Sequence, residues 1–125
     1  MNPWKLLDTT EIPNGGGEME LLQREDDFSI CLSGNRGELM NSRLYNSEEE
    51  LAKLGCAHLK STPGAQVLVG GLGMGFTLAA ALNAVSKSSQ VTVAELIPAV
   101  VEWNRGALGE RSGKPLLDSR AIVHS

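Results

Sequence analysis

Apolar residues form short clusters in the first third of the chain and longer, uninterrupted runs in the rest. Residues 18–24, 28–32 and 38–40 alternate or cluster in the way that short strands do. Turn-forming residues separate them at Asp26-Asp27 and at residues 33–37, and the glycine-rich residues 13–17 form a flexible connection before them. This pattern predicts a small antiparallel sheet.

A helix is predicted next, from Ser47 to about Leu59. Ser47 and Glu50 have the spacing of a capping box, in which side chains satisfy free backbone N–H groups of the first turn. The apolar face of this helix is expected to contain Leu51, Leu54 and His58. Because the turn-forming residues 61–64 end the helix, we predict a β-region plus one helix over residues 1–60. An α/β domain is predicted over residues 61–125.

Apolar runs after residue 60 alternate with helix-forming segments. Residues 67–69 and 91–94 are suited to strands that are buried on both faces. Between them, residues 76–82 combine helix formers with small side chains, which let a helix lie close to a sheet. A further helix is predicted from Pro98 to Gly106, and residues 121–124 are predicted as a third parallel strand. This alternation is typical of an α/β fold with a parallel sheet.

The glycines after the first of these strands separate three classes of ligand. A P-loop requires a lysine where this chain has Phe76, which argues against a triphosphate. A dinucleotide fingerprint requires a third small residue, but its two possible registers place Phe76 or Leu78 there. The pattern that remains is Gly71-x-Gly73-x-Gly75.

Glu95 follows the second strand, twenty residues after the last of these glycines. Neighbouring parallel strands end at one edge of a sheet, so the carboxylate would lie beside the glycine turn and accept hydrogen bonds from two ribose hydroxyls. Other interpretations stay open. The glycines could form a tight connection without a ligand, and Glu95 could be a solvated loop residue or a cap of the next helix.

The glycine pattern resembles the first motif of class I S-adenosylmethionine-dependent enzymes, with Glu95 matching their ribose-binding acid. With the β-region and the Ser47-Glu48-Glu49 helix before it, most of the chain resembles the polyamine aminopropyltransferases, the spermidine synthase family. The resemblance implies an α/β fold with a Rossmann-like parallel sheet of the S-adenosylmethionine-dependent methyltransferase type. We expect the chain to carry the first half of that sheet, preceded by a small antiparallel β-region.

The resemblance also implies a set of cofactor contacts. In that family the glycine turn borders the methionine-derived part of the cofactor, the acid holds the ribose, and the next apolar residue, here Leu96, lies against adenine. The implied cofactor-binding residues are Gly71, Leu72, Gly73, Met74, Gly75, Glu95 and Leu96. The implied cofactor is S-adenosylmethionine or decarboxylated S-adenosylmethionine, consumed as a substrate, without a metal.

The activity implied by the resemblance is transfer of an aminopropyl group to a small-molecule amine. Small β-regions of this family commonly form dimer interfaces, so a homodimer is expected, with Trp4 as a candidate contact. Two alternatives stay open: an S-adenosylmethionine-dependent methyltransferase, and a non-catalytic dimeric nucleoside-binding module.

The chain also departs from the family. A Tyr-His-Glu or Tyr-Gln-Glu stretch that shapes the amine site in the family is replaced by Ser47-Glu48-Glu49, and no glutamine lies around residues 38–41. The strand that carries the family's catalytic aspartate has no counterpart here, so the catalytic residues stay unknown; Glu102 and Glu110 are candidates only in principle. We expect a longer native chain to fold better than these 125 residues.

Composition narrows the partners further. The net charge of −4 argues against a nucleic-acid partner, because no basic stripe is present to neutralise phosphates. No apolar run has the length of a signal peptide core or a membrane span, which favours the cytoplasm. Cys31 and Cys56 are expected to be buried free thiols. Because the chain has only two histidines in addition to these cysteines, we expect no metal site.

Overall fold

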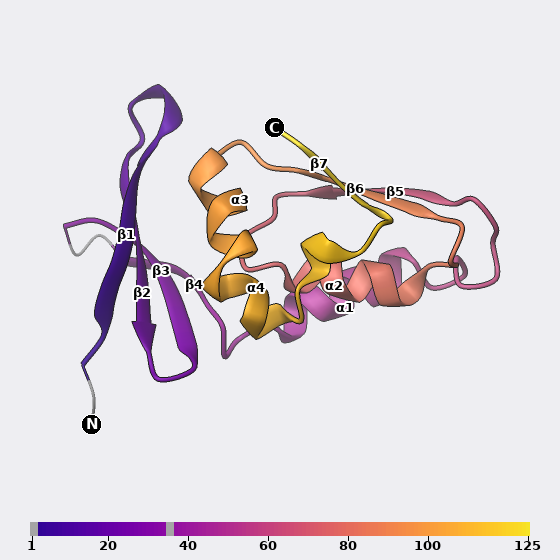
Figure 1. Cartoon of the computed structure of the whole chain (residues 1–125), viewed down its shortest axis with the longest axis horizontal. Coiled ribbons are helices and arrows are strands. Elements are labelled where there is room, and N and C mark those ends of the chain that lie inside the picture. Colours follow the sequence, from indigo (N-terminus) through magenta and orange to yellow (C-terminus); the bar gives the residue numbers. More distant parts are fainter. Residues whose placement is uncertain (1–2, 35–36) are drawn as a thin grey trace. The chain divides into compact units, whose positions relative to one another are not determined.

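The computed structural model describes residues 3–34 and 37–125 of the chain. Contacts divide the chain into two units, Met1–Leu44 and Tyr45–Ser125 (Figure 1). The sequence pattern places this division near residue 60. In the structure the helix that follows Leu44 belongs to the second unit, because it packs on another helix of that unit.

Four antiparallel strands form the first unit, in the order β1-β2-β3-β4. The strands are β1 (Lys5–Ile12), β2 (Gly17–Arg24), β3 (Asp27–Leu32) and β4 (Gly37–Asn41). Each strand pairs with its sequence neighbour, as short hairpin connections require. The predicted antiparallel sheet is confirmed, and β1 is an additional strand whose bounds were not predicted.

The glycine-rich residues 13–17 form a tight link and not a flexible connection. A single turn of 3-10 helix, η1 (Pro13–Gly15), joins β1 to β2, and Gly17 is already part of β2. The link is compact because Asn14 and Gly15 adopt the left-handed backbone conformation that tight turns require. Within the predicted turn at residues 33–37, Asn35 and Arg36 lie outside the described residues.

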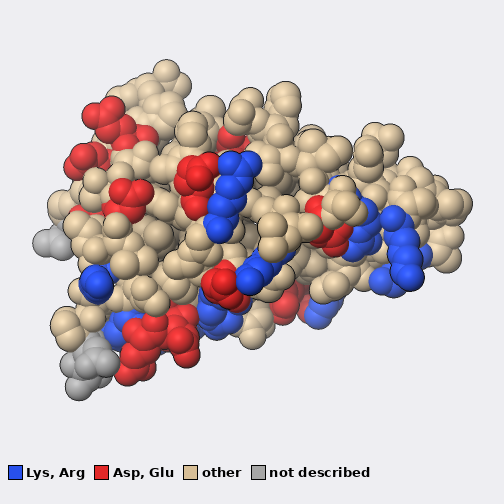
Figure 2. Space-filling model, in the orientation of Figure 1, with Lys and Arg blue, Asp and Glu red and all other residues tan. Residues whose placement is uncertain are grey.

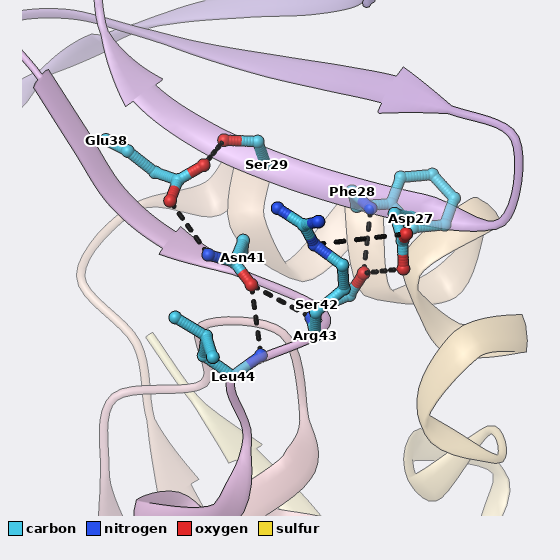
Figure 3. Close-up of polar contacts among 8 residues, drawn as sticks. All are labelled: Asp27, Phe28, Ser29, Glu38, Asn41, Ser42, Arg43 and Leu44. Atoms are coloured by element: carbon cyan, nitrogen blue, oxygen red, sulfur yellow. Dashed lines mark hydrogen bonds and ion pairs between the residues drawn. The ribbon is translucent and has the colours of Figure 1, made fainter. Parts of the chain in front are cut away.

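A partly buried polar network connects β3, β4 and the residues that follow β4 (Figure 3). The Ser29 hydroxyl donates to the Glu38 carboxylate, and Asn41 Nδ2 donates to the other carboxylate oxygen at 2.8 Å. Asn41 Oδ1 in turn accepts from the backbone N–H groups of Arg43 and Leu44, at 2.9 and 3.0 Å. The hydrogen bond from Ser29, and after it the one from Asn41, lowers the pKa of Glu38.

Three parallel strands form the sheet of the second unit, in the order β5-β6-β7. They are β5 (Gln66–Gly70), β6 (Gln90–Ala94) and β7 (Ala121–His124). The helices are α1 (Asn46–Gly55), α2 (Phe76–Ala84), α3 (Pro98–Arg105) and α4 (Ala107–Ser112), with a 3-10 turn, η2 (Pro115–Leu117), before β7. The predicted α/β fold with a parallel sheet is confirmed.

One face of this sheet forms the core and the other is open. Val91 and Val93 of β6 are fully buried, and α1, α2 and α4 lie on one side of the sheet in Figure 1. On the opposite face, Leu68 is 71% exposed and Ile122 is 42% exposed, and Thr92 lies between them in the register. The expectation that residues 67–69 are buried on both faces is therefore wrong for Leu68, because the described helices of this unit do not cover that face.

Helix α1 differs from its prediction in three ways. Its N-cap residue is Tyr45, without a capping side-chain hydrogen bond, so Ser47 lies inside the helix and forms no capping box. The helix ends at Gly55, a poor helix former, and not near Leu59. Ala52 is buried, as is Cys56 directly after the helix, whereas Leu51 and Leu54 are 65% and 75% exposed.

The segment after β6 follows its prediction up to Gly106. Helix α3 begins at Pro98 and ends before Gly106, as predicted. Beyond it, the sequence pattern did not predict α4, in which Glu110 lies. The loop before β7 is held by the Arg120 guanidinium, which binds the Asp118 carboxylate at 2.8 Å and the carbonyl of Ser86 at 3.2 Å.

Three general features complete the description. Among residues 3–34 and 37–125 no helix combines the length and apolarity needed to span a bilayer. Both cysteines are free thiols; Cys56 is buried and Cys31 is half-buried. On the face shown in Figure 2, basic side chains lie beside acidic ones.

Candidate functional site

The glycine turn joins the end of β5 to the start of α2. Gly71, Gly73 and Gly75 all have positive φ values, of 95°, 52° and 85°. The turn is closed by the N–H of Gly75, which donates to the carbonyl of Leu72 at 2.8 Å. Gly75 is also the N-cap of α2, so the first N–H groups of the helix lie next to the turn without partners inside the helix.

Gly75 and Gly71 differ in what an added side chain would meet. At Gly75, a Cβ atom would lie 2.8 Å from Asn104 Oδ1 and 2.9 Å from Ser112 Oγ, so the protein's own packing excludes a side chain. At Gly71, a Cβ atom would meet no heavy atom within 4 Å. Gly75 is therefore explained without a ligand, whereas the space beside Gly71 is open to one.

The Glu95 carboxylate lies against the turn, at the end of β6. Its Oε1 accepts from the backbone N–H of Leu72 at 2.8 Å, and its Oε2 accepts from the N–H of Ile97 at 3.0 Å. A carboxylate offers about four acceptor sites. These two bonds therefore leave about one site on each oxygen, enough for two ribose hydroxyls. Glu95 is thus neither a free loop residue nor only a cap of the next helix, because it links the turn to the start of α3.

The other predicted cofactor-binding residues divide into exposed and buried ones. Leu96, next to Glu95, is 72% exposed, as are several other leucines of this unit, and its side chain is open to a planar apolar group. Leu72 and Met74 are 3% and 5% exposed, so their side chains belong to the core. Only the backbone of these two residues can contact a ligand.

Asn104 is a residue of this site that the sequence did not identify. Its side-chain amide is buried, and Nδ2 donates to the carbonyl of Gly73 at 2.7 Å. The contact joins residues that are 31 positions apart, and an asparagine in a helix has no pattern that indicates such a partner. No signal in a single sequence could have found it.

A separate cavity of about 540 Å³ lies along α2, on the side of α1 and α4. Tyr45 stacks on Phe76 with ring centroids 4.8 Å apart, and the Arg111 guanidinium lies 5.8 Å from each ring centroid. Glu49 lines this cavity, and no residue from Gly71 to Gly75 does. The acidic stretch at the start of α1 therefore contributes at least one carboxylate to a hollow other than the glycine turn.

Neither carboxylate considered as a general base is placed for that role. Glu102 pairs with Arg105 at 2.7 Å on the exposed surface of α3. Glu110 pairs with Lys114 at 3.2 Å and is also exposed. In the part of the chain that the structure describes, no group of three potential metal ligands occurs either.

Comparison with known proteins supports the fold. The chain matches no protein-family model. It matches no curated protein sequence. Among solved structures it is similar to spermidine synthase in complex with the transition-state analogue AdoDATO, with a TM-score of 0.69 and 20% sequence identity. The match covers 94% of this chain and 39% of that one, so the chain spans about two fifths of the length of that enzyme.

Proposed function

We propose that this chain binds S-adenosylmethionine or its decarboxylated form at the turn from Gly71 to Gly75. The observation that carries the proposal is the Glu95 carboxylate, which lies against this turn with acceptor sites left for ribose hydroxyls. Leu96 offers an exposed apolar side chain beside it for the adenine ring. The fold shared with an enzyme solved with AdoDATO supports the same class of ligand.

The activity we propose is aminopropyl transfer to an amine, as in a spermidine synthase. In such a reaction the positive sulfur makes its neighbouring carbons electrophilic, and a neutral amine held in line attacks the propyl carbon. The C–N bond forms, the C–S bond breaks, and a carboxylate accepts the proton of the amine. Neither Glu102 nor Glu110 is suited to that role, because each is exposed and paired with a cation.

A non-catalytic nucleoside-binding module is the alternative that one observation favours. The described residues place Glu95 at the turn, and both of its oxygens are already bonded to backbone N–H groups. A carboxylate engaged in this way can hold a ribose, but it is poorly placed to take a proton. A methyltransferase would use the same ligand turn and differ in which carbon is attacked. A homodimer formed through β1 to β4 stays a prediction.

Calorimetric titration distinguishes these possibilities. We expect binding of S-adenosylmethionine, of its decarboxylated form, or of methylthioadenosine. Preference for the decarboxylated form would favour aminopropyl transfer over methyl transfer, and turnover with an added amine would exclude the binding module. If none of the three compounds binds, the proposed function is wrong.

The Glu95→Ala variant tests the site itself. Loss of the hydrogen bonds between a charged carboxylate and the ribose should weaken binding by about 1.5–3 kcal/mol. The matched control is Glu102→Ala, which removes an exposed glutamate of α3 that pairs with Arg105. Circular dichroism must show both variants folded at the titration temperature. Equal affinity in Glu95→Ala and Glu102→Ala would show that Glu95 does not hold the ligand.

A further inference from the structure

The peptide groups of the glycine turn are held from two directions by one segment of the chain. Glu95 accepts from the N–H of Leu72, and Asn104 donates to the carbonyl of Gly73. Both side chains come from the end of β6 and from α3, which follows it. The turn that the proposed function assigns to the ligand therefore has its N–H and C=O groups fixed by different residues of the same segment.

The orientation of the Asn104 amide follows from its neighbours. Nδ2 donates to the carbonyls of Gly73 at 2.7 Å and of Val100 at 2.8 Å. The reverse orientation would place an oxygen against two carbonyl oxygens, so the donor must face them. Oδ1 is then left buried, and it has no hydrogen-bond partner among the described residues. An unpaired buried acceptor is unfavourable.

That arrangement points to what Asn104 contributes. The residue is 3% exposed, and a buried apolar side chain of the same size would avoid the unpaired oxygen. The asparagine is therefore not explained by packing alone. Its distinctive contribution is the bond to Gly73, because the other acceptor, the carbonyl of Val100, belongs to its own helix.

We infer that Asn104 is a positioning residue for the ligand turn. It acts through the Gly73 carbonyl: by fixing that peptide group, it sets the direction in which the following N–H groups face the ligand. This inference rests on the proposed function for its effect on binding, but its effect on the turn is independent of any ligand.

The Asn104→Leu variant separates positioning from packing. Leucine has the same branching and the same number of side-chain heavy atoms, removes the unpaired oxygen and cannot donate to Gly73. We expect the variant to melt within a few degrees of the unchanged chain, and to bind S-adenosylmethionine about 3- to 10-fold more weakly, the range for one lost hydrogen bond. The matched control is Ser112→Ala, because Ser112 Oγ also lies beside Gly75 but donates to the carbonyl of Leu108 and not to the turn.

Amide hydrogen exchange measured by nuclear magnetic resonance without a ligand supplies the second readout. In Asn104→Leu, the N–H groups of Leu72 and Gly75 should exchange at least several-fold faster than in Ser112→Ala, since they close the turn that Asn104 holds. Should Asn104→Leu fail to fold, Asn104→Ala, whose side chain also cannot donate to Gly73, gives the same comparison.

The outcomes separate the two proposals. Weaker binding with faster exchange at the turn supports the positioning role. Unchanged exchange at Leu72 and Gly75 would overturn it, whether or not the chain binds a ligand. If the original chain binds S-adenosylmethionine, equal affinity in the Asn104 variant would overturn it as well. Failure of the parent to bind any of the three compounds, with faster exchange in the variant, would overturn the proposed function and leave Asn104 as the residue that orders the turn.

Discussion

The glycines of the turn have different structural roles, although a motif treats them as equivalent. The spacing of the glycines predicts one ligand turn, but Gly75 is required by the packing of Asn104 and Ser112 behind it, and Gly71 has open space beside it. Spacing identifies which positions are glycine. It does not show which of them face the protein and which face solvent, because that depends on contacts between residues distant in sequence.

This difference predicts unequal effects of two alanine substitutions. Gly75→Ala should lower the free energy of unfolding by about 2–4 kcal/mol, because it adds a steric conflict to a backbone conformation that alanine disfavours. Gly71→Ala should lower it by about 1–2 kcal/mol, from the backbone term alone. Urea denaturation measures both. Equal losses would mean that the space behind Gly75 can adjust.

Glu38 is the residue of the first unit whose ionisation should change stability. Its carboxylate is exposed but accepts from Ser29 and Asn41, and Arg43 adds a weaker favourable charge (Figure 3). The hydrogen bonds lower its pKa in the folded chain below the ordinary value of 4.5. The carboxylate therefore stabilises the folded chain fully above pH 4.5, and this contribution is lost as the pH falls through the lower pKa.

Comparison of the chain with its Glu38→Gln variant tests this dependence. In a Trp103→Phe background, Trp4 is the remaining tryptophan and lies in the first unit, so its fluorescence follows that unit. The difference in urea midpoint between the two proteins should shrink as the pH is lowered from 7 to 3. A difference that is independent of pH would show that the network does not depend on the charge of Glu38. Asp118, whose pKa is also lowered, is common to both proteins and cancels.

At the scale of whole elements, the sequence predicted strands better than helix faces. The strands that were predicted in both units follow alternation or continuous apolar runs, and these patterns are local, whereas β1 follows neither pattern. The face of α1 does not follow from local pattern, because Ala52 and Cys56 are buried while the larger Leu51 and Leu54 are exposed. The partner of α1 is α2, whose residues 79–81 are all alanine, and closely packed helices favour small side chains at their contact. A hydrophobicity pattern therefore predicts that the leucines are buried, whereas this contact is made by small side chains.

Helix α4 was missed for a related reason. Its six residues include Gly109, and glycines flank it at both ends, so the local sequence indicates a loop. The buried side chain of Leu108 makes the segment a helix through tertiary packing. The candidate site shows the same difference between features that follow from local sequence and features that depend on tertiary packing. The turn and Glu95 follow from spacing along the chain, whereas Asn104 is recognised only once α3 is placed beside the turn.

At the scale of the whole molecule, the open face of the β5-β6-β7 sheet is the feature that most affects behaviour in solution. Leu68 and Ile122 lie in the same cross-strand register on this face, separated by Thr92. Exposed apolar residues on one open face of a sheet promote association and dye binding. We expect the chain to bind anilinonaphthalene sulfonate and to associate as its concentration rises.

The double variant Leu68→Lys with Ile122→Lys should reduce both effects. Because the two side chains are exposed, the free energy of unfolding should change by no more than about 1 kcal/mol. Leu117→Lys is the matched control, since Leu117 is 79% exposed but lies outside the sheet. Dye fluorescence and sedimentation velocity provide the measurements. Equal dye binding in the double variant and the control would contradict the assignment to this face.

Backbone hydrogen bonds connect the residue after β5 to the end of β6, and the residue after β6 to the end of β7. The N–H of Gly71 donates to the carbonyl of Ala94 at 2.8 Å, and the N–H of Glu95 donates to the carbonyl of His124 at 3.0 Å. The residue at the end of β7 therefore supports the backbone of Glu95, which in turn supports the turn after β5. Mechanical tension or fraying at the end of β7 would be transmitted to the residue proposed to hold the ribose. Ligand affinity in this chain should thus respond to whatever orders its last four strand residues.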